Sequence, residues 1–390
     1  MPTAKSTRQS ISIHTFGTLE AWYAQAFEDI AAHWPSDAPN PFISGPYLAG
    51  LEKSLPPDIG MRYLVLFKDR QPVGWFVLQL VEFRTVDHVQ DEKVWSGWWG
   101  RIKYFISSFG NYRILVLGNL LSTGDHSGFF LLPEAETAVR FEELPGLLRR
   151  LARQEGAPVL MAKDYHRRQS WLERDAWNPL DFQPDMILDL PPNWHSFEDY
   201  LADMSSKYRV RARRAHKKAE GLAFQELSLG QIELLANELF ALYDKVVRSA
   251  GFSLAKVEPA YFVEMKRRLG PDYHLEACFA GDELVGFFTT IRNGTELEAN
   301  FIGFDNAFNR EHQLYLNMLY RMVEQGIRLR VQRIVFARTA MEIKSSVGAV
   351  AHDIYLYLVH RTAWKNALLP FFVRLMEPKE HWMPRHPFSK

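Results

Sequence analysis

A short segment with three charged side chains is the part of the sequence best placed to do chemistry. Residues 338–348 read RTAMEIKSSVG and carry Arg338, Glu342 and Lys344. Charged groups this close together could orient one another or clamp a polar headgroup. The segment follows a predicted strand at 333–337, and ligands of open α/β sheets bind beyond the carboxyl ends of strands. We therefore expect a functional site at this turn.

The residues before the turn predict the elements that must position it. Segments 296–305 (ELEANFIGFD) and 333–337 (RIVFA) are rich in Phe, Ile and Val, which is typical of strands. Between them, 310–326 predicts a helix. Its apolar residues recur at the spacing of one buried face: Tyr315, Met318, Leu319, Met322 and Val323. Asn309 offers a cap at the helix start and Gly326 an exit at its end. A strand, helix and strand of this length predict a right-handed parallel crossover.

Length and composition bound the class of protein. A chain of 390 residues predicts two domains, and Pro191 and Pro192 mark the expected boundary between 1–190 and 191–390. The 46 basic and 46 acidic residues balance, which argues against a protein built for extensive nucleic-acid binding. No apolar run reaches the roughly 18 residues of a spanning helix, and the first residues lack the character of a signal peptide. We expect a cytoplasmic protein.

Cysteine and histidine usage argues against disulfides and metals. The only cysteine, Cys278, lies in an apolar run that predicts a buried strand. The 13 histidines show no ligand spacing, so we expect no metal site.

The two halves of the chain repeat a pattern. Residues 67–76 (FKDRQPVGWF) and 279–288 (FAGDELVGFF) align without a gap and share Val-Gly-aromatic-Phe at the same spacing. Each predicts a hairpin that is followed by the same order of strands and helices. A structural duplication explains this better than chance, and two side-by-side α/β layers would leave a cleft between them.

The second half resembles the GNAT acyltransferase superfamily, in particular its tandem, FemAB-like branch. The resemblance covers roughly residues 195–375 and rests on four motifs of this sequence: SSKYRVRARRAHKK, VGFF, ELEANFIGFD and EIKSSVG. It implies an α/β (α+β) fold of two tandem GNAT-like domains, each a mixed central sheet flanked by helices. The first domain would be degenerate, and the second would carry the active site. It also implies transfer of an acyl or aminoacyl group from a thioester or a charged tRNA to an amine.

The resemblance implies roles for particular residues. Lys344 matches the lysine of a K-x-x-x-G turn in FemAB-like transferases, where an ammonium would stabilise the developing oxyanion. Glu298 lies on the strand where GNAT enzymes often hold a general base, although alternation with Leu297 also allows it to face water. His312 and Asp305 are alternative bases. Tyr315 would donate a proton to the leaving thiolate, unless its helix position makes it a core residue.

The segment 309–316 departs from the family pattern. GNAT enzymes bind the pyrophosphate of CoA with an R-x-x-G-x-G/A loop before the central helix, whereas NREHQLYL contains no glycine. Glu311 beside a helix N-terminus would repel a phosphate. CoA in the usual pose is therefore disfavoured. We still expect acyl-CoA or acyl-carrier protein as donor co-substrate and no tightly bound cofactor.

Residues 207–218 predict an amphipathic helix with a cationic face. They contain seven Lys and Arg residues and no acid. A solvated, ion-paired face is one interpretation. The other is contact with the phosphates of CoA, tRNA or anionic lipid headgroups, for which Tyr208 and Arg211 are candidate substrate-binding residues together with Arg338, Glu342, Tyr315 and Asn309.

Two aromatic segments, 94–112 and 364–382, place Trp, Tyr and Phe among Lys and Arg. This mixture is typical of a membrane–water interface, although packing within a domain interface also explains it. We expect an N-acyltransferase that moves a fatty acyl group to an amine-bearing lipid at the inner face of the membrane. One alternative is aminoacyl-tRNA-dependent transfer to a peptidoglycan precursor, and another is a non-catalytic binding protein with this fold.

Overall fold

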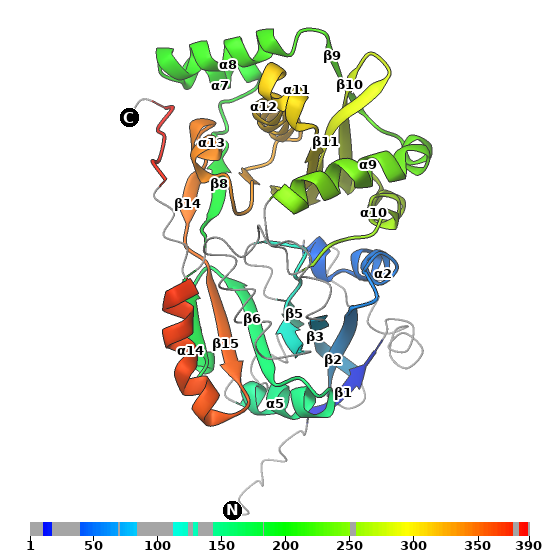
Figure 1. Cartoon of the computed structure of the whole chain (residues 1–390), viewed down its shortest axis with the longest axis vertical. Helices are drawn as coiled ribbons and strands as arrows, with labels where there is room; N and C mark the ends of the chain where they lie inside the picture. The colour runs from blue at the N-terminus through cyan, green and yellow to red at the C-terminus, as the bar shows by residue number, and fades with distance from the viewer. Residues whose placement is uncertain are drawn as a thin grey trace, which may run out of the picture.

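The computed structural model describes residues 11–17, 40–68, 71–83, 112–123, 128–131, 143–181, 183–249, 255–376 and 382–388. These residues form two sheets, one above the other along the long axis of the molecule, with helices around them (Figure 1). The aromatic segment 94–112 lies outside the described residues except for Tyr112.

The first sheet has the strand order β1-β2-β3-β4-β6-β15-β7, with β5 beside β3. All of its pairs are antiparallel except β4–β6, so the sheet is mixed. Its strands are β1 (Ile11–Phe16), β2 (Ile59–Lys68), β3 (Gln71–Phe83), β4 (Tyr112–Leu117), β5 (Phe129–Leu131), β6 (Val159–Tyr165), β7 (Asn178–Asp181) and β15 (Tyr355–His360). The accompanying helices are η1 (Pro41–Ile43), α2 (Gly45–Glu52), α5 (Leu144–Gln154), α6 (Ser170–Glu173) and α14 (Ala363–Met376).

The second sheet has the order β14-β8-β13-β12-β11-β10-β9. Its strands are β8 (Asp185–Asp189), β9 (Leu222–Glu226), β10 (Tyr273–Ala280), β11 (Glu283–Asn293), β12 (Glu296–Phe304), β13 (Arg333–Val335) and β14 (Val350–His352). Its helices are α7 (Phe197–Asp203), α8 (Ser206–Lys218), α9 (Leu229–Ser249), α10 (Ala260–Leu269), η5 (Gly270–Asp272), α11 (Asn306–His312), α12 (Leu314–Arg328) and α13 (Met341–Ser346). β12 and β13 are parallel and the other pairs are antiparallel, which confirms the predicted parallel pair and makes this sheet mixed as well.

The two sheets exchange strands. β8 precedes residue 190 but pairs with β13 and β14 of the second sheet, while β15 from the C-terminal part pairs with β6 and β7 of the first. The sheets therefore do not divide at the expected boundary between 190 and 191. Met186, Ile187 and Leu188 are all buried. An apolar run of this kind predicts a buried strand, but it does not indicate which sheet the strand joins.

The predicted helix at 310–326 is two helices. Gln313 has a left-handed backbone (φ 50°) and separates α11 from α12. Asn309 lies inside α11, and its side chain caps α12 by accepting a hydrogen bond from the Tyr315 amide at 2.9 Å. Gly326 does not end α12, which continues to Arg328. A Cβ at Gly326 would lie 2.7 Å from Ile334 Cδ1, so glycine permits close packing of α12 on β13.

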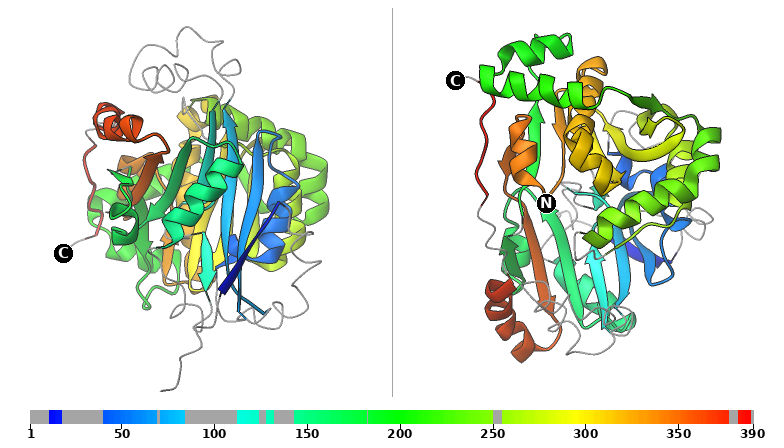
Figure 2. Two further views of the ribbon diagram at one scale, coloured as in Figure 1. Left: turned by 90° about the horizontal axis from the view of Figure 1, so that it is seen from below. Right: turned by 45° about the horizontal axis from the view of Figure 1, so that its top comes forward.

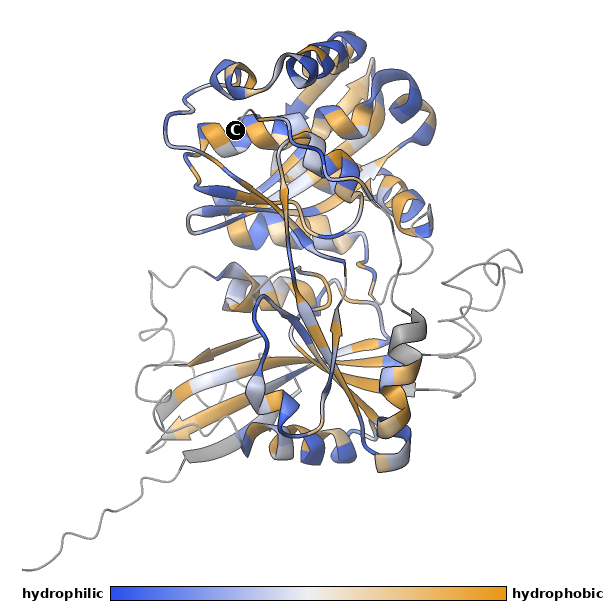
Figure 3. Cartoon of the chain, turned by 90° about the vertical axis from the view of Figure 1, so that its left-hand side faces the viewer, coloured by the Kyte–Doolittle hydropathy of each residue, from blue (hydrophilic) through white to orange (hydrophobic). Residues whose placement is uncertain are grey.

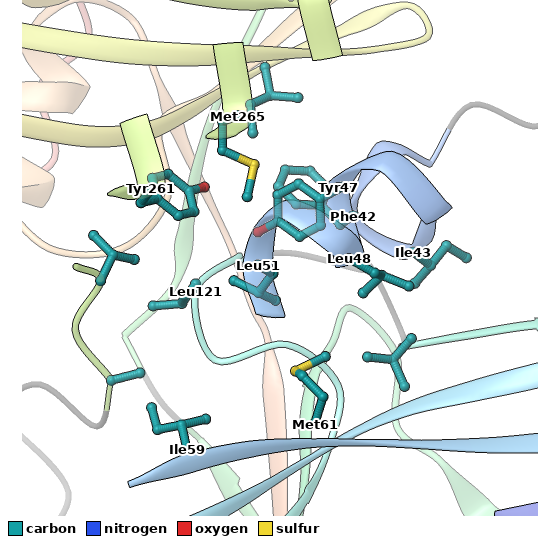
Figure 4. Packing of buried hydrophobic residues seen from close by; sticks show 14 of the residues in the cluster. Phe42, Ile43, Tyr47, Leu48, Leu51, Ile59, Met61, Leu121, Tyr261 and Met265 are labelled. Atoms are coloured by element: carbon teal, nitrogen blue, oxygen red, sulfur yellow. The ribbon is translucent and has the colours of Figure 1, made fainter. Parts of the chain in front are cut away.

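Apolar clusters lie on both faces of the second sheet. One cluster joins α7, α8 and α12 to the sheet and includes Cys278, which is a buried core residue as expected. The other extends from α9 and α10 to α2 and the first sheet. Figure 4 shows Tyr47 and Leu51 of α2 beside Tyr261 and Met265 of α10. This cluster is continuous between the two halves, so close packing fixes the position of one sheet relative to the other.

Hydropathy follows the layers. The strands of both sheets are mostly hydrophobic (Figure 3). Among the described residues, no helix combines the length and apolarity that crossing a bilayer requires.

Candidate active site where the two sheets meet

The turn after β13 has an unusual backbone. Ala337, Thr339 and Ala340 have φ values of 58°, 67° and 49°, in the left-handed region that favours glycine. Such residues cost of order 1–3 kcal/mol each and persist only where the surrounding structure imposes them. A hydrogen bond from the Met186 amide to the Ala337 carbonyl, at 3.3 Å, ties the turn to β8. Concentrated strain of this kind favours a functional turn.

Lys344 of α13 reaches back into this turn. Its side chain is buried, and Nζ donates hydrogen bonds to the carbonyls of Ala337 (3.1 Å) and Arg338 (2.5 Å). Burial lowers the pKa of Lys344 from 10.5 to about 7, although the charge of Asp185 opposes this shift. Both protonation states are therefore populated near neutral pH. An ammonium would keep one N–H for a substrate oxygen, and a neutral amine would keep its lone pair for a proton.

Asp185 is a buried carboxylate that the sequence did not single out. It begins β8, is 0 % exposed, and neither carboxylate oxygen accepts a hydrogen bond within the described part of the chain. His166 Nε2 lies 3.6 Å from Asp185 Oδ2. The charge of Asp185 raises the pKa of both Lys344 and Lys163, so it lies within electrostatic reach of both amines. A buried carboxylate is costly unless it is paired, which favours a role in charge placement here.

The first sheet contributes a second lysine and its partner. Lys163 and Asp164 lie near the end of β6, which runs to Tyr165, and both are buried. Lys163 Nζ donates to the Ser122 carbonyl at 2.6 Å and pairs with Asp164, whose backbone is left-handed at φ 60°. Asp164 also pairs with Arg338, so an ion pair connects the turn after β13 to the end of β6. Burial lowers the pKa of Lys163, with the charge of Arg338 adding to the effect, and lowers that of Arg338 to about 10.

We call Lys163, Asp164, Asp185, Arg338 and Lys344 the inter-sheet cluster. They come from four segments between residues 163 and 344, and they meet because the end of β6, the start of β8 and the turn after β13 lie next to one another. Lys344 and Arg338 were predicted site residues. Lys163, Asp164 and Asp185 were not predicted as site residues. The sequence signal that could have identified them is a charged residue at one end of an otherwise apolar strand.

Glu298 lies on the face of β12 that is turned toward the first half. It is 3 % exposed and accepts a hydrogen bond from Asn293 Nδ2 at 3.1 Å, so it does not face water. Two residues on, Asn300 accepts from the Tyr261 hydroxyl at 2.8 Å and donates to the Leu121 carbonyl at 3.5 Å. Glu298 therefore keeps its place as a candidate base, in a buried polar environment.

His312 and Asp305 hold helix ends. His312 Nδ1 lies 2.7 Å from the Lys218 carbonyl at the end of α8. Asp305 caps α11 by accepting from the Ala307 amide at 2.8 Å, and it pairs with Lys245 at 3.0 Å. The hydrogen bond from Lys245 is the main cause that lowers the pKa of Asp305, which makes it a weaker base.

Tyr315 and Asn309 belong to the same junction of α11 and α12. Tyr315 packs on Phe304, and burial raises its pKa, which weakens it as a proton donor to a thiolate. The side chain of Asn309 is engaged in capping α12.

The remaining predicted residues gather around a pocket of about 630 Å³. Tyr208 and Arg211 line it. Glu342 is exposed and pairs with Arg385, which also lines the pocket. Arg385 further donates its amide to Ser345 Oγ at 3.0 Å, so the pocket adjoins α13, the helix of Lys344. We call it the α8 pocket.

Residues 206–345 match a family described as Acetyltransferase (GNAT) domain. This segment is similar to GNAT acetyltransferase domains. The match runs from the start of α8 into α13 and includes Glu298, Arg338 and Lys344. The predictions of the GNAT superfamily, of mixed sheets flanked by helices and of an acyltransferase are thereby confirmed.

Solved structures that align with this chain include a tandem GNAT protein from the clavulanic acid biosynthesis pathway, with 12% identity and a TM-score of 0.48 over 90% of this chain and 99% of that one. L-PGS from Bacillus licheniformis has 12% identity and a TM-score of 0.47 over 90% and 97%. FemX has 12% identity and a TM-score of 0.45 over 78% and 89%. No curated protein matches the chain. Within the described residues, no group of three or more His, Cys, Asp or Glu side chains could hold a metal ion.

Proposed function

We propose that the protein is an N-acyltransferase that moves an acyl group, preferably a long chain, from a thioester such as acyl-CoA or acyl-carrier protein to an amine of a lipid or lipid precursor. The observation that carries this proposal is Lys344, buried in the strained turn of the GNAT domain with a pKa of about 7. The reaction would take place at the membrane surface.

The chemistry needs one proton acceptor and one oxyanion donor. The acceptor ammonium must lose a proton before its nitrogen can attack the thioester carbonyl. A C–N bond then forms, the carbonyl oxygen becomes an oxyanion, and the C–S bond breaks to release a thiol that takes up a proton. Neutral Lys344 would accept the first proton, and the resulting ammonium would donate to the oxyanion through its free N–H. Asp185 would stabilise this charged form.

An exposed apolar face on α14 supports a lipidic substrate. Trp364, Leu368 and Phe371 are 64%, 44% and 66% exposed and recur at helical spacing, while Leu369 packs inward. Lys365 lies next to Trp364 with its ammonium 5.6 Å from the ring centroid. Aromatic side chains beside basic ones favour a membrane–water interface. α14 lies on the same side of the molecule as the C-terminal segment and α8 (Figures 1 and 2).

The test is thiol release from acetyl-CoA, palmitoyl-CoA and fatty-acyl carrier protein in the presence of vesicles with or without an amine-bearing lipid. We expect release that depends on a long-chain donor and on the amine, with the acylated lipid identified by mass spectrometry. Lys344→Arg keeps donors at this position but cannot act as a base near neutral pH, so it should lower the rate at least 100-fold. Lys256→Met, at a lysine that is about half exposed, is the matched control and should retain activity.

Aminoacyl-tRNA-dependent transfer to a peptidoglycan precursor is the second candidate, because α8 carries seven Lys and Arg residues. It would be favoured by turnover with charged tRNA alone and by binding that weakens steeply with salt. Absence of turnover with every thioester and every charged tRNA, together with an unaffected cellular function of folded Lys344→Arg, would leave the non-catalytic binding protein.

A further inference from the structure

The α8 pocket is cationic and has no acidic lining residue. It is bounded by Ser206, Lys207, Tyr208, Val210, Arg211, Arg214, Gln313 and Arg385. Four of these eight side chains carry a positive charge. A volume of about 630 Å³ is within the range of small-molecule sites, so the pocket could hold the charged end of a substrate.

Within the described part of the chain, the cations of α8 that line the pocket have no carboxylate partner. Lys207, Arg211 and Arg214 recur at helical spacing, where like charges repel. None of the three forms an ion pair with a carboxylate of the described residues. By contrast, Arg213 of the same helix lies 3.7 Å from Glu198 and does not line the pocket. The repulsion among the three pocket cations would be relieved by an anionic ligand.

The usual anion site of this fold is filled by the protein itself. At the start of α12, the Tyr315 amide donates to Asn309 Oδ1 rather than being available to a phosphate. Asn317 Nδ2 donates to the carbonyls of His312 (3.0 Å), Gln313 (3.2 Å) and Ala215 (3.0 Å), which closes the junction between α11, α12 and α8. Close approach of a phosphate to this helix end is disfavoured, because the segment has no glycine and the Tyr315 amide is already bound by Asn309.

We propose that the α8 pocket binds the phosphate group of a substrate, as a mono- or diester, in place of the helix end of α12. This deepens the proposed function and rests on it, because Arg385 connects the pocket to Ser345 and Glu342 of α13, the helix of Lys344. The phosphate belongs either to a soluble ester such as CoA or to a lipid headgroup. Val210, which is 54% exposed at the pocket, would lie against apolar atoms next to that phosphate.

The test compares the double variant Arg211→Gln/Arg214→Gln with Arg213→Gln, a matched control on the same helix. Calorimetry measures binding of CoA, and co-sedimentation measures binding to vesicles of phosphatidylglycerol, with phosphatidylcholine vesicles as the uncharged reference. Both assays use the full chain without turnover, so they report on the pocket even if acyl transfer is not observed. Circular dichroism checks that each variant is folded.

We expect the double variant to lose at least tenfold in affinity for one probe, while Arg213→Gln stays within twofold of the wild type. Loss for CoA alone would assign the phosphate to a soluble donor, and loss for phosphatidylglycerol vesicles alone would assign it to a lipid headgroup. The proposal is overturned if the wild type binds neither probe, or if Arg213→Gln weakens binding as much as the double variant does.

Discussion

The stability of the protein should depend on pH through Lys344, and Lys344→Met should remove that dependence. The pKa of Lys344 is lowered to about 7 in the folded protein, against 10.5 for an exposed lysine. The unfolded chain therefore holds this proton more tightly than the folded chain does. Below about pH 7 both states are protonated and burial of the charge has its full cost. As pH rises from about 7 toward 10.5, the folded state has already lost its proton while the unfolded state still holds one, so the folded state becomes relatively more stable.

The size of the effect follows from the shift. One pKa unit is worth about 1.4 kcal/mol, so the full cost of the buried ammonium is roughly 5 kcal/mol. Between pH 7 and pH 9, linkage predicts a gain of roughly 2 kcal/mol in the free energy of unfolding from Lys344 alone. Burial also lowers the pKa of Lys163, so Lys163 adds a gain in stability of the same sign. Because Lys163 is present in the wild type and in Lys344→Met, its contribution largely cancels when the two are compared.

The assay is urea denaturation of the wild type and Lys344→Met at pH 7 and pH 9. The wild type should gain roughly 2 kcal/mol more than the variant between the two values. Lys256→Met, at an ion-paired surface position, should follow the wild type. Equal gains in the free energy of unfolding for the wild type and Lys344→Met would refute the reasoning, because they would show that burial does not lower the pKa of Lys344.

Three further predictions concern activity and packing. If Lys344 acts as a base, kcat/KM should rise through about pH 7, whereas a falling limb near pH 7 would assign it to oxyanion stabilisation by the ammonium. Asp164→Asn removes the carboxylate that pairs with Arg338, so it should lower the free energy of unfolding by about 3–5 kcal/mol; a loss below about 1 kcal/mol in denaturation would contradict a buried ion pair. Gly303→Ala would place a Cβ 2.7 Å from the backbone of α9 and should cost about 1–3 kcal/mol, while Gly146→Ala in α5, with open space around it, should be neutral or stabilising.

Local patterns along the chain are enough to predict several of the elements. The apolar spacing in 314–328 defines both a helix and its inner face, since Met318, Leu319, Met322 and Val323 are all buried. The hairpins at 67–76 and 279–288 form as β2–β3 and β10–β11. These predictions succeed because helix and hairpin formation depends on residues close together in the chain. The same dependence on local pattern explains why one helix was predicted over 310–326 where the structure has two. The apolar spacing continues through Gln313, although the backbone of that residue is left-handed and breaks the helix.

The sequence alone determined the acyltransferase fold class and a charged segment that contains Lys344, because the motifs that indicate both are formed by residues close together in the chain. Only the tertiary structure decided what surrounds that lysine. Asp164 and Asp185 are distant from it in the sequence and enter the inter-sheet cluster because the two sheets exchange β8 and β15 and meet at their strand ends. The pKa of Lys344 then depends on how completely those strands exclude water, and burial is a property of packing that no local pattern encodes.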